Sequence, residues 1–356
     1  ASIGFSRASG GDNKKAAIVA FQDGSDADPT GLTFWTSSGT GTGADASEVM
    51  RITSGGVLLL GHTSSTNTGN LTAQAQIETT GASAALSITR NTNSANGSYL
   101  VLAKTRSGTV GGNTILQDGD EIGTVRFSGA DGNDRASHAA EISGQVDGTP
   151  GSNDMPGRLV FKTTSDGANS ATERMRLTSA GQLGIGETAP VAELHIKQGS
   201  AGDVDTHANV ALVLEGSGDT LLQFQTPNSA TDVGIIFGDP NDRDVGAIKY
   251  DHTNDSFKFH TDDVEKLRLR SDGELVVGGD SGIAIPELTL KSNTTGNGML
   301  SLLSFKDSSN AEKAYLGYGS TSTGHFNILN LLGDLNFYAG STNIRFTLDD
   351  NSRISL

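Results

Sequence analysis

The sequence predicts an all-β fold, an elongated and repetitive fibre of short strands and hairpins that associates with copies of itself. A recurring motif and short runs of alternating apolar and polar residues predict the repeats and the strands. The composition predicts the self-association. Of the 356 residues 35% are hydrophobic and 5% aromatic, and 47 are glycine, against a usual glycine share of about 7%. Because one such chain has little material for a core, we expect its apolar residues to be buried against further copies.

The recurring motif is a strand, a turn and a second short strand that ends in glycine. It reads ERMRLTSAGQLGIG at residues 173–186, EVMRITSGGVLLLG at 48–61 and EKLRLRSDGELVVG at 265–278, with a weaker copy, NIRFTLDDNSRISL, at 343–356. A repeated unit that cannot bury its own apolar face indicates a stacked architecture. The copies divide the chain into four β repeats, the first partial and the last shorter: residues 1–61, 62–188, 189–281 and 282–356.

The elements of one repeat follow a common order. An entry strand leads to a second apolar strand, a glycine-centred strand pair, a hairpin arm and the closing motif. Short strands are expected at residues 17–21, 32–35, 86–89, 99–103, 210–215, 233–237, 256–260 and 288–291. Asp-Gly pairs at 131–132, 147–148, 166–167 and 272–273 predict tight type I′ hairpin turns, in which both central residues have positive φ. Apolar residues do not recur at helical spacing over a dozen positions, so we expect little helix.

The spacing between the motif copies is irregular, which argues against a propeller or a regular solenoid. The irregularity places insertions in loops, chiefly at residues 91–114 and 138–156. Loops on a rigid scaffold often carry recognition residues. These two are therefore the candidates for receptor contact, although simple decoration of a passive shaft explains them equally well.

The motif carries a charge pair of fixed spacing. Arg51, Arg176 and Arg268 each lie between two apolar neighbours, which places each arginine on the opposite face of a strand. The glutamates of the motif, Glu48, Glu173 and Glu265, lie three residues earlier and so fall on the other face of a straight strand. A glutamate–arginine pair would then form between chains or across a bend. The alternative is a strand edge guarded by solvated charges.

Composition also bears on the partners. The formal net charge of -16 argues against nucleic acid, which needs clustered Lys and Arg. We find no membrane-spanning stretch or signal peptide, and cysteine is absent, so no disulfide holds the chain. Since it begins with Ala1 rather than methionine, we expect a fragment of a longer polypeptide. The aspartate-rich loops 23–28 and 239–244 could hold cations weakly.

The residues do not indicate catalysis, and we expect no catalytic, cofactor or metal residue. The seven histidines form neither a His-x-His pair nor a His-Glu-x-x-His motif, and His195 is expected to be a hydrogen-bonded structural residue. A Gly-x-Ser-x-Gly elbow is missing. The glycine-rich stretch 184–190 lacks the following helix of a dinucleotide site. Aspartates lie in turns, and the single tryptophan, Trp35, is expected to be packed rather than stacked on sugar, which argues against a glycoside hydrolase.

The stretch ERMRLTSAGQLGIGETAPVAELHIKQ, residues 173–198, resembles the shaft repeats of tail fibres from tailed bacteriophages and related prophage proteins. Gly184, Gly186, Pro190, Leu194 and Ile196 are among the positions that match their pattern. The resemblance implies a homotrimeric β fibre of the virion. Many relatives end in an endosialidase-type intramolecular chaperone. For this chain we expect that such a domain was removed, that the fragment stops short of it, or that the tip belongs to another protein.

The expected function is therefore that of a tail-fibre shaft in host attachment, without enzymatic activity. Its partners would be two further copies, other tail or baseplate proteins and a host cell-surface glycan or protein. A bacterial extracellular adhesin built from the same repeats is the second interpretation. A polysaccharide-degrading tailspike is the third.

Overall fold

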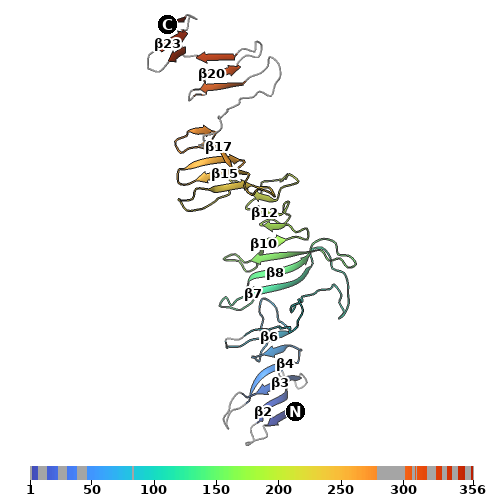
Figure 1. The fold of residues 1–356 in the computed structure, drawn as a ribbon. Coiled ribbons are helices and arrows are strands. Elements are labelled where there is room, and N and C mark those ends of the chain that lie inside the picture. The colour runs from blue at the N-terminus through green and yellow to red at the C-terminus, as the bar shows by residue number, and fades with distance from the viewer. Residues whose placement is uncertain are drawn as a thin grey trace. The chain divides into compact units, whose positions relative to one another are not determined.

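All regular secondary structure in the described residues is β-strand, which confirms the predicted all-β class (Figure 1). The computed structural model describes residues 2–6, 14–22, 30–37, 46–81, 84–278, 301–306, 309, 311–318, 326–330, 335–338, 344–348 and 354–355. The chain separates into two compact units, residues 1–221 and 222–356. Within the described part, we find no helix with the length and apolar character needed to cross a membrane.

The first unit contains two sheets. A six-stranded sheet is formed by β1 (Ser2–Ser6), β2 (Lys14–Gln22), β3 (Thr30–Thr36), β4 (Ser47–Ile52), β5 (Leu58–Leu60) and β6 (Ala75–Ile77). A seven-stranded sheet is formed by β7 (Glu121–Ser128), β8 (His138–Val146), β9 (Gly157–Thr163), β10 (Thr172–Leu177), β11 (Leu183–Ile185), β12 (Leu194–Lys197) and β13 (Leu212–Glu215).

The second unit contains three sheets. A five-stranded sheet is formed by β14 (Val233–Phe237), β15 (Gly246–Asp251), β16 (Ser256–Thr261), β17 (Val264–Leu269) and β18 (Leu275–Val277). A three-stranded sheet follows, made of β19 (Ser301–Lys306), β20 (Glu312–Tyr318) and β21 (Phe326–Asn330). The last, also three-stranded, is made of β22 (Leu335–Tyr338), β23 (Ile344–Leu348) and β24 (Ile354–Ser355). The antiparallel pairing of β23 with β24 confirms that the weak C-terminal copy of the motif forms two paired strands.

In every sheet the strands are ordered as they occur in the sequence. Most neighbours are antiparallel, as short turns require, while β6, β12 and β13 join parallel to the strand before them. The described strands contact chiefly their neighbours within one sheet. Consequently little apolar surface is buried; the buried apolar residues are Leu59, Leu116, Val146, Val160, Ala192 and Ala247.

The four Asp-Gly turns differ from the prediction. Each glycine has positive φ, for example +96° at Gly132 and +87° at Gly273, but none of the preceding aspartates does. A type I′ turn needs positive φ at both positions, so the predicted turn type is wrong at these sites. Two consecutive positive values occur instead at Asp262 and Asp263, with φ of 53° and 54°. These residues form the two-residue connection between β16 and β17.

Two predicted strands are not formed. Residues 86–89 and 99–103 have strand-like composition, but neither run belongs to a strand of the described chain. A strand exists only when its backbone groups pair with a neighbour, and composition cannot supply that neighbour. The predicted strand at 288–291 lies outside the described residues.

The predicted loop 138–156 is also partly wrong, because residues 138–146 form β8, between β7 and β9. In this strand Ala140, Ile142 and Gly144 lie on one face, and Glu141 and Ser143 lie on the other. Because Ala140 and Gly144 are small, the alternation of apolar and polar residues is not recognisable in the sequence. Residues 147–156 do form a connection. The other predicted loop, 91–114, contains no strand.

Candidate functional site

The glutamate and arginine of the motif pair within one chain. In the second copy, Arg176 Nε and Nη2 donate to Glu173 Oε1 and Oε2 over 2.5 and 2.8 Å. Arg51 and Arg268 make the same bidentate pairs with Glu48 and Glu265. Of the alternatives, the structure thus confirms pairing across a bend. The hydrogen bonds that Arg176 donates to Glu173 raise the pKa of Arg176.

A β-bulge explains how residues three apart reach the same face. Against β9, Glu173 is opposite Lys162 and Met175 is opposite Phe161, so Arg174 is an extra residue. The same shift makes Val49 and Lys266 extra residues in the other copies. One inserted residue reverses the alternation of side chains along a strand. The glutamate therefore moves to the face of the arginine.

The closing glycine of each copy completes the bulge. Gly186 N donates to the carbonyl of the extra residue Arg174 over 2.9 Å. Gly61 and Gly278 bond the carbonyls of Val49 and Lys266 in the same way. Gly186 has φ of 72°, and a Cβ at this position would collide with the carbonyl oxygen of Lys197. Glycine is needed here because it alone tolerates both conditions readily.

A second shared feature is a row of apolar side chains that crosses each sheet. Residues opposite one another on paired strands project from the same face. In the six-stranded sheet the row is Ile3, Ile18, Phe34, Met50, Leu60 and Ile77. In the seven-stranded sheet it is Val125, Ile142, Phe161, Met175, Ile185, Ile196 and Leu214. In the five-stranded sheet it is Ile235, Ile248, Phe259, Leu267 and Val277. Leu303, Leu316 and Ile328 continue the pattern in the sheet of β19.

We call these residues the apolar row, and none of them is buried in the single chain. Val125 is 42% exposed, Ile142 37% and Ile235 46%. Apolar surface in contact with water is unfavourable by about 25 cal/mol per Å². A face of this kind recurs on sheet after sheet of the described chain, and contiguous exposed apolar patches are typical of interaction surfaces.

The opposite face of the sheets is polar but covered. Arg51 lies between Thr33 and Leu59 on the neighbouring strands, and both of these residues are buried. Arg176 lies beside Val160, which is fully buried. Long arginine side chains cover surface with their aliphatic parts while their charged ends pair with acids. The chain thus covers its polar face with its own side chains and leaves the apolar row open.

Ion pairs stabilise this polar face. Glu141 accepts from Arg126 Nε at 2.7 Å and from Lys162 Nζ at 3.4 Å. Burial works to raise the pKa of Glu141, but the hydrogen bonds from Arg126 and Lys162 outweigh it, so the pKa lies below its usual range. The glutamate is therefore held charged under a cover of cationic side chains.

His195 belongs to a buried polar cluster where β12 meets β13. Its Nε2 lies 3.0 Å from Glu215 Oε2, which confirms the predicted hydrogen-bonded role, and its side chain is 2% exposed. Lys197 Nζ lies 2.6 Å from Glu187 Oε2 and 3.4 Å from Glu215 Oε1. The Lys197 hydrogen bond lowers the pKa of Glu187, and the backbone N–H of Ala201 contributes most to lowering that of Glu215.

Glu187, His195 and Glu215 are close enough to share a metal ion, since one ligand atom of each lies within 4.8 Å of the others. The Lys197 ammonium already supplies the positive charge that these carboxylates need. A metal would have to displace it. The cluster is therefore explained as a structural ion pair network.

A second acidic group joins Asp242 and Asp244 to Asp263, which sequence reasoning missed because it follows in another turn. Burial and then the charges of Asp242 and Asp244 raise the pKa of Asp263. Cation binding at loop 239–244 stays a prediction. Loop 23–28 lies outside the described residues.

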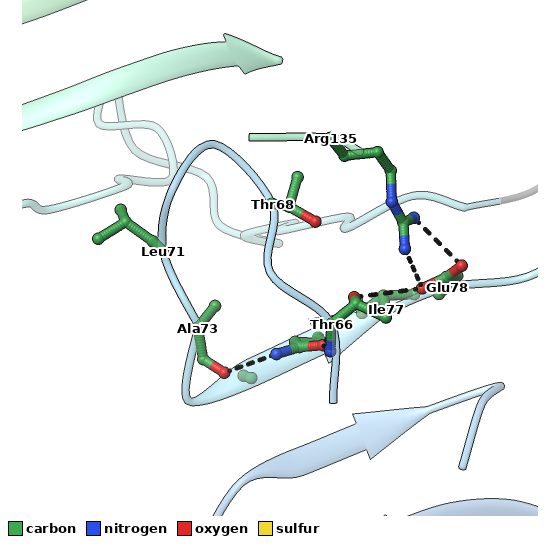
Figure 2. A pocket seen from close by; sticks show the side chains of 9 residues that line it. Thr66, Thr68, Leu71, Ala73, Ile77, Glu78 and Arg135 are labelled. Atoms are coloured by element: carbon green, nitrogen blue, oxygen red, sulfur yellow. Dashed lines mark hydrogen bonds and ion pairs between the residues drawn. The ribbon is translucent and has the colours of Figure 1, made fainter. Parts of the chain in front are cut away.

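A pocket of about 280 Å³ lies between β6 and the turn that joins β7 to β8. Figure 2 shows Arg135 reaching from that turn to Glu78, with Leu71, Ala73 and Ile77 along the pocket. Gly69 N also donates to the Arg135 carbonyl at 2.7 Å. These contacts tie the seven-stranded sheet to the segment around β6. Neither candidate loop, 91–114 or 138–156, lines this pocket.

Trp35 lies in β3 and is half-buried. Its indole N–H donates to the Thr33 hydroxyl at 2.9 Å. The ring therefore belongs to the polar face of the six-stranded sheet, where Trp35 lies opposite Ala17 and Glu48.

Comparison with known proteins gives similarities in structure. No protein-family model matches the chain, and no curated protein matches it in sequence. One similar structure is the carboxy-terminal domain of the bacteriophage T5 L-shaped tail fibre, with 14% identity, a TM-score of 0.42 and coverage of 58% of this chain and 84% of that one. Another is the same domain with its intramolecular chaperone domain, with 15% identity and a TM-score of 0.44. That match covers 67% of this chain and 64% of the solved chain. Both structures come from the same phage tail fibre.

Proposed function

We propose that this chain forms the shaft of a homotrimeric phage tail fibre and that the apolar rows of three copies face one another. The open apolar row carries the proposal. It occurs on each of the larger sheets and again in the sheet of β19, while arginine and lysine side chains cover the polar face of the six- and seven-stranded sheets. Only association removes such a face from water without unfolding the sheet.

Another copy of the chain is the partner that best matches these rows. Several sheets present the same face, and a partner that covers all of them must carry apolar rows of its own. A further copy of the chain carries the same apolar rows, because it has the same sequence. Homo-oligomers with closed symmetry are also the usual outcome of such self-association.

Unpaired apolar runs support the same arrangement. Residues 98–103 include Tyr99, Leu100 and Val101, which are 68%, 69% and 77% exposed. In the next repeat, residues 220–224 include Leu221 and Leu222 at 86% and 59%. Both runs are apolar on two faces, which is typical of strands buried between other strands. Neighbouring copies would supply the missing partners.

The shaft role is structural, and we propose no enzymatic activity for the chain. The four repeats at residues 1–61, 62–188, 189–281 and 282–356 would be its modules. It would join other tail or baseplate proteins in the virion and hold the host-binding part away from the particle. The host cell-surface glycan or protein is then contacted by the fibre as a whole.

Native mass spectrometry of the purified chain tests the assembly, and we expect three times the chain mass. A monomer mass at micromolar concentration would refute the trimer. Immunogold electron microscopy, with antibodies against this chain and phage particles produced by the host that encodes it, tests the location. Labelling of tail fibres supports the proposal, whereas labelling of the bacterial surface without particles would favour the adhesin.

A further inference from the structure

We propose that residues 86–89 of one copy add as a parallel strand to the free edge of β6 in a neighbouring copy. The inference rests on the trimer proposed above and goes further, because it names a strand that the chains exchange and its register. It also explains why a segment with the composition of a strand pairs with no strand in the described part of its own chain.

The repeats provide the template for this pairing. In both repeats a parallel strand follows the closing motif. β6 pairs with β5, with Leu58 opposite Ala75, and β12 pairs with β11 in the same way, with Leu183 opposite Leu194. After β12 the chain continues to ALVLEG at residues 211–216, and after β6 it continues to ALSITR at 85–90. The first of these segments contains β13, which pairs parallel to β12.

The two repeats differ in whether this position is filled. In the described residues β6 pairs with β5 alone, and residues 84–90 belong to no strand. Leu86 is 73% exposed and Ile88 50%. At the equivalent position Leu214 is half-buried beside Ile196. The first repeat therefore has both an unfilled strand position and a strand-like segment without a partner.

The register follows from the template. Leu212 is opposite Leu194 and Leu214 is opposite Ile196, which places Leu86 opposite Ala75 and Ile88 opposite Ile77. Ile77 ends the apolar row of the six-stranded sheet, and Ile88 would extend that row by one residue. Leu214 extends the row of the seven-stranded sheet in the same way. The parallel pairing of β13 with β12 and the continuation of the apolar row therefore predict the same register.

We infer that residues 86–89 of another copy occupy the free edge of β6, because residues 86–89 of the same chain do not pair with that edge. Downstream of it, Arg106 Nε and Nη2 bind Asp120 at 2.6 and 2.7 Å, and Lys104 Nζ lies 3.4 Å from the same carboxylate. These contacts hold residues 104–106 beside the start of β7, the first strand of the seven-stranded sheet. The segment 84–90 lies between β6 and this point of attachment in the sequence, and we infer that it pairs with a strand of another copy.

Cysteine cross-linking tests the exchange, since the chain contains no cysteine. The variant Ile77→Cys/Ile88→Cys is treated with dibromobimane, which bridges two thiols a few ångströms apart, and is then analysed under denaturing conditions. We expect covalent dimers and trimers. The matched control is Ile196→Cys/Leu214→Cys, whose residues pair within one chain and should give cross-linked monomers.

Mixed assemblies remove any remaining ambiguity. When chains carrying only Ile77→Cys are co-expressed with chains carrying only Ile88→Cys, a cross-link forms only between chains, and we expect covalent dimers. Cross-linked monomers alone from the double variant would overturn the exchange. So would the lack of any Ile77–Ile88 product in a protein of trimer mass whose control pair reacts, and the trimer itself would then stand. A monomer mass overturns both proposals.

Discussion

Removing one side chain of the apolar row should weaken association of the chains by a measurable amount. Ile142 lies in β8, between Val125 and Phe161 in the row of the seven-stranded sheet, and is 37% exposed. Burying a whole isoleucine side chain stabilises by about 1.5–3 kcal/mol, so covering the exposed third contributes about 0.5–1 kcal/mol per chain. For three copies the Ile142→Ala change should cost about 1.5–3 kcal/mol of association free energy, which is roughly 10- to 150-fold in the association constant.

Sedimentation velocity over a range of concentrations measures this shift, and Ile142→Asp should give monomers under the same conditions. The control is Val213→Ala, which removes apolar atoms from the polar face of the same sheet, where Val213 lies opposite His195. We expect Val213→Ala to leave association unchanged. The assignment of the interface fails if the two alanine variants weaken the trimer equally, or if Ile142→Asp remains a trimer.

Three further changes test the motif and the polar face. Arg176→Met leaves the partly buried Glu173 without its bidentate partner and should lower the urea midpoint by an amount that corresponds to about 1–3 kcal/mol; adding Glu173→Gln should recover part of the loss, and no recovery would mean that packing rather than charge holds the bulge. Gly186→Ala forces a Cβ against the Lys197 carbonyl at φ of 72° and should cost more than the roughly 1–2 kcal/mol of a left-handed alanine, whereas Gly167→Ala, with φ of 77° and open space, should cost about that amount in thermal unfolding. The hydrogen bond from Lys258, and to a smaller extent the one from Thr253, holds the pKa of Asp251 well below its usual range. The stability that this charged group contributes is therefore present above the unfolded pKa of about 3.9 and should be lost as pH falls through the depressed folded pKa. In urea titrations between pH 6 and pH 2, the Asp251→Asn variant should lose less unfolding free energy on acidification than the unmodified chain.

Much of the strand content was readable from alternation. The runs at residues 233–237 and 256–260 lie in β14 and β16, and the motif copies form the paired strands that their pattern predicts. Prediction failed where a strand depends on something other than its own composition. Residues 86–89 and 99–103 have the right side chains but no partner strand among the described residues. In contrast, β8 has a partner on each side but few large apolar residues.

The candidate site was visible only in part. The spacing of Glu173 and Arg176 is clear in the sequence, and a bend in the strand is one way for residues at that spacing to pair. The bulge at Arg174 is not readable, because it depends on the register against β9. The contact of Arg135 with Glu78 was missed, since the two residues come from segments that are far apart in the sequence.

The sequence by itself determined the all-β class, the repeats, and the charge and glycine positions of the motif, because alternation and turn chemistry act over a few neighbouring residues. Only the tertiary structure decided which face each side chain occupies. One extra residue at Val49, Arg174 or Lys266 reverses the alternation and brings glutamate and arginine together. The tertiary structure also decided that the polar face is the covered one, since the apolar row forms only when strands from distant parts of the sequence are aligned in register.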